Sequence, residues 1–326
     1  MLKDNFRKGK RDLISDVPGV RVGHKTISNG SIQTGVTIID PSLDNIFKNK
    51  YIAASHVING FGKTSGLIQV DELGTLESKI GLTNTLSVGA VQQALVKHML
   101  KDNPEIGLST GTINVVVGEC NDGYLNDIRG CHVSEQDVND ALNDVKEDFE
   151  QGAVGAGTGM SCFEMKGGIG SASRIVILDN KEYVVGSLVL TNFGLQKDFV
   201  KETTLFSDED IEKGSIIIVL ATNIPLDARQ LKRICKRVPI ALGQLGSHLG
   251  NGSGDIVLAF TTGNTVPHNI ETEIIVQKVI HENKIDMLFR ATIEATRNAI
   301  LSSLKHAKTT VGRDGNTRYN IKEIEN

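Results

Sequence analysis

Apolar residues follow two different spacings along the chain, and these spacings predict a mixture of strands and helices. Short apolar or alternating runs bounded by turn residues predict strands. They lie at about 20–24, 35–40, 52–58, 114–119, 173–178, 184–191, 215–221 and 255–261. Apolar positions three and four residues apart predict helices at about 88–100, 135–149, 226–245 and 285–306, the first with Ser87 as its cap. Residues 66–70 fit either a short strand or the start of a helix.

The predicted strands come in groups, with the long helices placed between the groups. Grouped strands favour a layered α+β fold over a strictly alternating parallel sheet. The chain shows no fixed-period repeat and no stretch rich in proline, glycine and serine that would separate two domains. We therefore expect one domain that covers residues 1–326.

The composition is that of an ordinary globular protein, and it argues against several classes of partner. Hydrophobic residues make up 39% of the chain, charged residues 23%, and the net charge is −4, so we expect no nucleic-acid surface. The amino terminus is charged, and no apolar run approaches the roughly 20 residues that cross a membrane. A cytoplasmic protein without membrane contact is the expectation.

Cofactor and metal signatures are also missing from the sequence. The four cysteines and eight histidines are scattered, with no C-x-x-C pair and no metal-ligand spacing, so we expect reduced thiols and no bound metal. The glycine-rich tract at 152–159 lacks the Gly-Lys-Ser/Thr ending of a phosphate loop and the spacing of a dinucleotide loop. We expect a structural or substrate-lining loop there, and no cofactor.

A Gly-Ser-Gly turn opens directly into the strand predicted at 255–261. Ser253 stands between Gly252 and Gly254, so we expect it at the tip of a strand with little side-chain cover. This arrangement suits a structural turn, and it equally suits a serine that its own backbone carbonyl or a substrate must reach. No histidine and acid are spaced to complete a Ser-His-Asp triad. A nucleophilic Ser253 would need another base, and the α-amine freed by cutting the Gly252–Ser253 bond, with a pKa of about 8, could serve.

Four further polar residues have both a functional and a structural interpretation. Glu119 follows a buried strand, and Glu294 lies inside the final predicted helix, where it is either functional or a solvated helical charge. Asn192 and Asn223 each end an apolar strand. Asparagine at such a position forms a turn more often than it stabilises an oxyanion.

Four blocks of the sequence, which run in order along the chain, carry a resemblance to a known family. They are Asp16–His24, Asn59–Gly62 with its continuation through Glu72–Gly74 to Leu82–Gly89, Gly118–Asp127, and Asn251–Asp255. These blocks resemble the DmpA-type aminopeptidases, also called the β-peptidyl aminopeptidase family.

The resemblance implies an αββα sandwich and a precursor that cuts itself between Gly252 and Ser253. The products would be residues 1–252 and 253–326. The mature enzyme would remove N-terminal residues from peptides, amides or esters through an acyl-enzyme on Ser253, without a cofactor. Members of this family are usually homo-oligomers, often tetramers of αβ units.

The resemblance also suggests roles for individual residues. Thr292 and Glu294 match a serine and a glutamate that lie close to the nucleophile, with threonine in place of the serine. Asn223 matches the oxyanion asparagine, with Asn192 as the alternative. Glu119 matches the carboxylate that faces the substrate's amino group.

Two positions near these residues carry their own expectations. Asn121 stands where some members have an aromatic residue, which implies a more polar pocket. Asp255 would either hold the new amine or cap the turn.

Two other functions stay open on the sequence alone. One is an acyltransferase of the ornithine acetyltransferase type, although those enzymes use a threonine nucleophile and this chain has Ser253. The other is an uncleaved binding protein that shares the fold.

Overall fold

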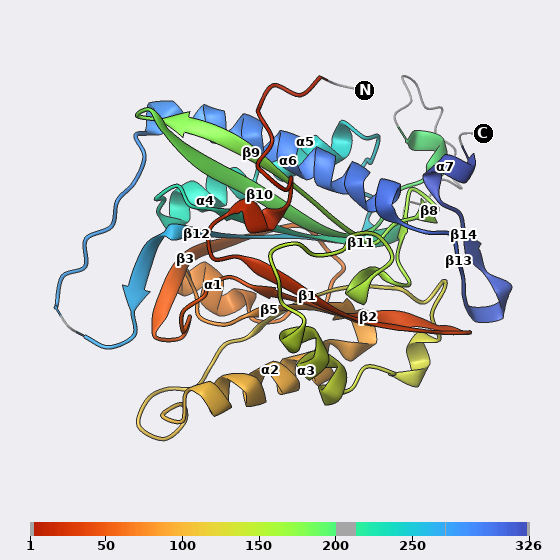
Figure 1. Ribbon diagram of the computed structural model, residues 1–326, viewed down its shortest axis with the longest axis horizontal. Helices are drawn as coiled ribbons and strands as arrows, with labels where there is room; N and C mark the ends of the chain where they lie inside the picture. Colours follow the sequence, from red (N-terminus) through yellow and green to blue (C-terminus); the bar gives the residue numbers. More distant parts are fainter. Residues whose placement is uncertain (1–2, 200–212, 271, 325–326) are drawn as a thin grey trace.

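A computed structural model describes residues 3–199, 213–270 and 272–324. Its main elements form four layers, in which helices cover the outer faces of two stacked sheets (Figure 1). The helices α5 and α6 lie on one side and α2 and α3 on the other. This arrangement confirms the predicted α+β fold of αββα type.

The larger sheet has six strands in the part of the chain that the structure describes, and the strand that begins at the Gly-Ser turn lies inside it. This strand, β12, runs parallel to β11 on one side and antiparallel to β3 on the other. In sheet order the strands are β4 (Thr75–Leu76), β3 (Asn49–Gly60), β12 (Gly252–Pro267), β11 (Lys213–Thr222), β10 (Lys181–Asn192) and β9 (Ile169–Leu178).

The smaller sheet has four strands, and two short hairpins lie outside the sandwich. The four strands are, in sheet order, β1 (Arg21–Asn29), β2 (Ile32–Asp40), β5 (Ile80–Asn84) and β6 (Val116–Cys120). The hairpins pair β7 (Ser161–Cys162) with β8 (Met165–Lys166), and β13 (Thr310–Val311) with β14 (Thr317–Arg318).

The four longest helices of the described residues divide between the two outer faces. Helices α2 and α3 contact the four-stranded sheet, while α4 and α6 contact the six-stranded sheet. Within the described residues the α-helices are α1 (Leu67–Leu73), α2 (Val88–Asp102), α3 (Glu135–Asn143), α4 (Ala228–Cys235), α5 (Val238–Gly243), α6 (Ile285–His306) and α7 (Ile321–Ile324).

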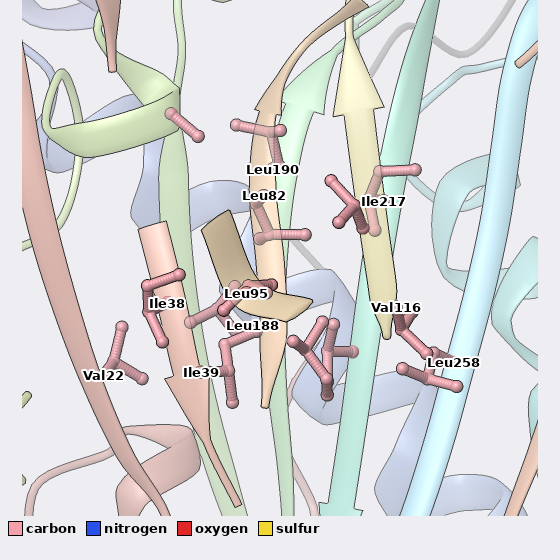
Figure 2. Close-up of a cluster of buried hydrophobic side chains, with 14 of the residues drawn as sticks. Val22, Ile38, Ile39, Leu82, Leu95, Val116, Leu188, Leu190, Ile217 and Leu258 are labelled. Atoms are coloured by element: carbon pink, nitrogen blue, oxygen red, sulfur yellow. The ribbon is translucent and has the colours of Figure 1, made fainter. Parts of the chain in front are cut away.

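Strand β11 shows how the apolar pattern builds two cores. Successive strand side chains point to opposite faces, so Ile217 and Val219 join the core between the sheets, while Ile216 and Ile218 join the core under the helices. Figure 2 shows the first of these cores, with side chains from both sheets packed together. A strand that is buried on both faces reads as a continuous apolar run, which is why the sequence revealed it.

The structure corrects three of the predicted helical features. The helix predicted at 226–245 is two short helices, because Pro239 lies at the start of α5 and cannot continue a helix from α4. The helix predicted at 135–149 ends at Asn143, and Lys146 instead pairs with Val22 of β1. Ser87 precedes α2, but its side chain makes no capping hydrogen bond.

Two further expectations from the sequence can be compared with the fold. The glycine tract forms a buried 3-10 turn at Gly155–Gly157, packed against Val36 and Thr37 of β2, so its role is structural. In the part of the chain that the structure describes, no helix has the length and apolar character needed to cross a membrane.

Candidate active site

Several strand ends meet at one edge of the sandwich, and this edge carries most of the candidate residues. Because β12 and β11 are parallel, their first residues lie side by side, with Ser253 opposite Gly214. The antiparallel neighbours end there, so Gly60 of β3 lies opposite Gly254 and Asn192 of β10 opposite Ser215.

Ser253 is buried at this edge, with only 1% of its surface exposed. This corrects the expectation of a serine with little cover, because neighbouring strands flank it on both sides. Its hydroxyl donates a 2.6 Å hydrogen bond to Oδ1 of Asp255, whose surface is also 1% exposed. Residues two apart on a strand share a face, so β12 itself holds the hydroxyl against the carboxylate.

The peptide bond before Ser253 belongs to a tight turn that a neighbouring side chain holds in place. The backbone N–H of Ser253 donates to the carbonyl of Gly250 at 3.0 Å. Nδ2 of Asn59 donates to the carbonyls of Leu249 and Gly250 at 2.7 and 3.0 Å, and lies 3.3 Å from Oδ2 of Asp255. Asn59 therefore connects the turn to the carboxylate that binds the serine.

Gly254 explains why the sequence needs a second glycine beside the serine. A Cβ at this position would lie 2.6 Å from the carbonyl oxygen of Phe61. That oxygen belongs to the backbone and cannot move aside cheaply, so a larger residue would push β3 away from β12. This close approach of β3 and β12 keeps the turn within hydrogen-bonding distance of Asn59.

A cavity of about 900 Å³ opens beside the turn. Gly252 and Asn251 form part of its wall, and so do the sequence-predicted residues Glu119, Asn121 and Asn192. Volumes of this order accommodate small molecules and short peptides. The structure thus brings four predicted site residues to one cavity, with Ser253 directly behind its wall.

Glu119 stands at the end of β6 with its carboxylate held in place. One oxygen accepts the backbone N–H of Lys63 at 2.9 Å, and the other accepts the hydroxyl of Thr85. The residue is buried apart from 2% of its surface. A fixed, buried carboxylate at a cavity wall is suited to binding a cation such as an ammonium group.

Asn192 ties two loops of the cavity wall together. Its Oδ1 accepts the backbone N–H of Ser161 at 2.9 Å, and its Nδ2 donates to the carbonyl of Asn121 at 2.9 Å. An amide nitrogen carries two hydrogens, so one N–H of Asn192 stays available for a ligand. Asn121 itself uses its side-chain oxygen to accept the N–H of Gly123 at 2.9 Å.

The structure does not bring Asn223 to this site, which corrects the expectation that it serves the nucleophile. Thr222 lies opposite Thr261, eight positions along the strands from the pair of Gly214 and Ser253. At about 3.3 Å per residue, Asn223, one position further on, is about 30 Å away along the sheet. Its Oδ1 instead accepts the N–H of Val184 at 2.8 Å.

Glu294 also lies at the far end of the sheet, which corrects its expected place beside the nucleophile. Its carboxylate accepts Nε of Arg174 at 2.5 Å and the backbone N–H groups of Asn5 and Phe6 at 2.7 and 3.2 Å. Arg174 lies opposite Val185, which is on the same level as Thr222. Glu294 therefore anchors the amino-terminal segment and neutralises a buried arginine.

Thr292 shares this far location, and the same correction applies to it. It lines a small apolar cavity together with Val185 and Thr222. Its hydroxyl is buried and has no hydrogen-bond partner among the described residues. A proton relay from Ser253 to Thr292 and Glu294 is incompatible with this geometry.

Buried ionisable groups hold the loops of the cavity wall. Burial lowers the pKa of Lys166 to about 7, and its ammonium group donates to the carbonyls of Gly157, Met160 and Gly167 at 2.7–3.0 Å. Burial also raises the pKa of Asp122 to about 7, and this side chain accepts Nδ2 of Asn126 at 3.0 Å. These contacts fix the loops that carry Ser161 and Tyr124, both of which line the cavity.

Sequence reasoning assigned no role to Asn59 and left the role of Asp255 open. Both residues lie inside the blocks that carry the family resemblance, and this position is the signal in the sequence that could have pointed to a functional role. The hydrogen bonds between Asp255, Ser253 and Asn59 depend on strand pairing, which local sequence does not reveal. Among the described residues, no group of three or more His, Cys, Asp or Glu side chains could hold a metal ion.

Comparison with known proteins gives matches over almost the whole chain. The profile of peptidase family S58 matches residues 12–318. The β-peptidyl aminopeptidase BapA of Sphingosinicella microcystinivorans is 32% identical over an alignment of 351 positions that covers 98% of this chain and 87% of BapA.

Two solved structures extend this similarity to the fold. The PH0078 protein from Pyrococcus horikoshii OT3 has a TM-score of 0.93 and 47% identity, over 99% of this chain and 94% of that protein. The L-aminopeptidase D-Ala-esterase/amidase from Ochrobactrum anthropi, described as a variant of the Ntn hydrolase fold, has a TM-score of 0.90 and 30% identity, over 98% and 93%.

Proposed function

The chain belongs to peptidase family S58, and from that premise we propose that Ser253 is both its site of self-cleavage and its catalytic nucleophile. The family match and the aminopeptidase relatives make the protein a hydrolase of the serine aminopeptidase type. The observation that carries the residue assignment is the buried hydrogen bond from Ser253 to Asp255 at the wall of the cavity that Glu119 lines.

Self-cleavage needs a base before any new α-amine exists. In the uncut chain the hydroxyl of Ser253 donates to Asp255, so this carboxylate is placed to take its proton. Oγ then attacks the carbonyl carbon of Gly252, the Gly252–Ser253 C–N bond breaks, and the released nitrogen takes up the proton as an amine. Water hydrolyses the resulting ester, which frees the Gly252 carboxylate and restores the serine hydroxyl.

After the cut, the α-amine of Ser253 becomes the base for its own hydroxyl. Its pKa of about 8 lets it accept the Oγ proton during acylation and return it to the leaving amine. The products, residues 1–252 and 253–326, would stay together because β12 lies between β3 and β11 of the larger product. The small product also contains α6, which packs on β9 and β10.

Glu119 gives the enzyme its preference for a free amino terminus. A substrate ammonium beside this buried carboxylate forms a charge-assisted hydrogen bond, which is stronger than a neutral one. Acetylating the substrate's amino group removes the charge, so we assign exopeptidase specificity to this contact. Hydrolysis of an amino-acid amide, compared with its N-acetyl derivative, tests the proposed activity directly.

We assign the oxyanion contact to the available N–H of Asn192. Replacing Asn192 with alanine is expected to lower kcat for amide hydrolysis by about 10²–10³, the usual cost of one oxyanion donor. Steady-state kinetics of the cleaved enzyme measure this loss.

Asn223→Ala is the matched control, because it removes the same group at the far end of β11. Its lost hydrogen bond to Val184 should cost about 1 kcal/mol of stability and leave kcat intact. A larger loss of kcat in the Asn223 variant than in the Asn192 variant would reverse the assignment.

Assembly into a homo-oligomer of αβ units and a cytoplasmic location stay predictions from the sequence.

A further inference from the structure

We infer that Arg318 binds the carboxylate of a short peptide substrate, on the leaving-group side of the bond that is cut. The inference rests on the proposed function and adds a substrate class to it, namely peptides of a few residues with a free carboxyl terminus. Arg318 lies in β14 of the carboxyl-terminal hairpin and lines the same cavity as Glu119.

Two contacts fix the guanidinium group of Arg318 at the cavity wall. Its Cζ lies 3.9 Å from the centre of the Tyr124 ring, a cation–π contact. Its Nε donates to the hydroxyl of Ser161 at 3.1 Å. Arg318 is half-buried, and it forms no ion pair with any carboxylate of the described residues. An arginine braced in this way loses little side-chain freedom when it binds a ligand.

The position of Arg318 relative to the reacting bond follows from a row of contacts. The hydroxyl of Ser161 accepts the hydrogen bond from Nε of Arg318, and the backbone N–H of Ser161 donates to Oδ1 of Asn192. A single residue, Ser161, therefore separates Arg318 from the proposed oxyanion contact. Asn192 continues the row by donating to the carbonyl of Asn121, two positions after Glu119. The ammonium site and Arg318 therefore lie at opposite ends of this row, with the oxyanion contact between them.

This order of charges matches a short peptide zwitterion. Its ammonium group would meet Glu119, its scissile carbonyl Asn192, and its terminal carboxylate Arg318. A guanidinium group binds a carboxylate through two parallel hydrogen bonds, a geometry that a lysine cannot reproduce. A residue spans at most about 3.6 Å, so only a peptide of a few residues places its carboxylate so near the scissile bond.

The test compares two substrates that differ only at the carboxyl end, a dipeptide and its C-terminal amide. The wild-type cleaved enzyme is expected to have a kcat/KM at least about tenfold higher for the free acid, the effect of one charge-assisted contact. Arg318→Met keeps the apolar stem over Tyr124 and removes the charge, so this preference should disappear. Arg318→Lys should restore part of it, with the change seen mainly in KM.

Arg237→Met is the matched control, because Arg237 also stacks on a ring, with its Cζ 4.2 Å from the centre of Phe289, but lies outside the cavity. It should keep the wild-type preference. Equal kcat/KM for the acid and the amide in the wild type, or an unchanged preference in Arg318→Met, would overturn the carboxylate site while leaving the aminopeptidase activity established. A cleaved wild type that hydrolyses neither substrate would overturn the proposed function, and the carboxylate site with it.

Discussion

Replacing Ser253 with alanine is expected to leave the chain uncut and without aminopeptidase activity. Without Oγ there is no atom to attack the carbonyl of Gly252, and no new α-amine forms. Loss of a catalytic serine lowers kcat by about 10⁶ in well-studied hydrolases, so activity should fall below detection. A denaturing gel and an amide hydrolysis assay on the same preparation measure both effects.

Ser253→Cys separates the chemistry from a folding defect. It keeps a nucleophilic atom at the same place and should still split, at a reduced rate. Asn59 and Asp255 make their contacts independently of the serine hydroxyl, so the alanine variant should keep its fold, which a thermal melt verifies. An alanine variant that still splits at this bond would contradict the assignment of Ser253.

Asp255→Asn is expected to slow self-cleavage by about 10²–10⁴, the contribution of a positioned general base. Asparagine keeps the size of the side chain and an oxygen that accepts the Ser253 hydroxyl, but it cannot take up the proton at neutral pH. The uncut fraction, followed over time after purification, measures the rate.

The matched control for this variant is Asp140→Asn on the surface of α3. Asp140 forms an ion pair with Lys25 and does not contact the turn before Ser253. It should split at the wild-type rate. If Asp255→Asn splits as fast as this control, the base in the uncut chain is another group.

Much of the site could be predicted because its residues stand at strand ends that the sequence makes visible. Ser253 opens β12, Asn192 closes β10 and Glu119 follows the apolar run of β6. Each stands where an apolar run meets polar residues, the usual place for functional side chains on a sheet. The layered α+β fold was predictable for the same reason, because grouped apolar runs indicate stacked sheets.

The expected positions of Asn223, Thr292 and Glu294 were wrong because they depend on the directions of strands and helices in the fold. Local sequence does not encode these directions. Asn223 directly follows β11 and Asn192 is the last residue of β10, and the two strand ends look alike in the sequence. Because β11 runs parallel to β12, its first residue lies beside Ser253 and its last residue lies at the opposite edge. The position of Thr292 and Glu294 likewise depends on how α6 crosses β9 and β10.

The burial of Ser253 also arises from tertiary structure. A glycine-flanked serine looks uncovered along the chain, but β3 and β11 approach it from both sides once the sheet forms. The hydrogen bond to Asp255 in turn answers the question that the sequence left open about that carboxylate. In the uncut chain this carboxylate accepts the hydroxyl hydrogen bond of Ser253, the residue that we propose as the nucleophile.

Intact-mass spectrometry of the purified wild-type protein tests the central claim most directly, with amino-terminal sequencing of the smaller species. We expect two chains, residues 1–252 and 253–326, the second beginning with Ser253. Their masses together should exceed that of the 35.2 kDa precursor by one water. A protein that stays at the full mass after prolonged incubation, or that splits at another bond, would contradict it.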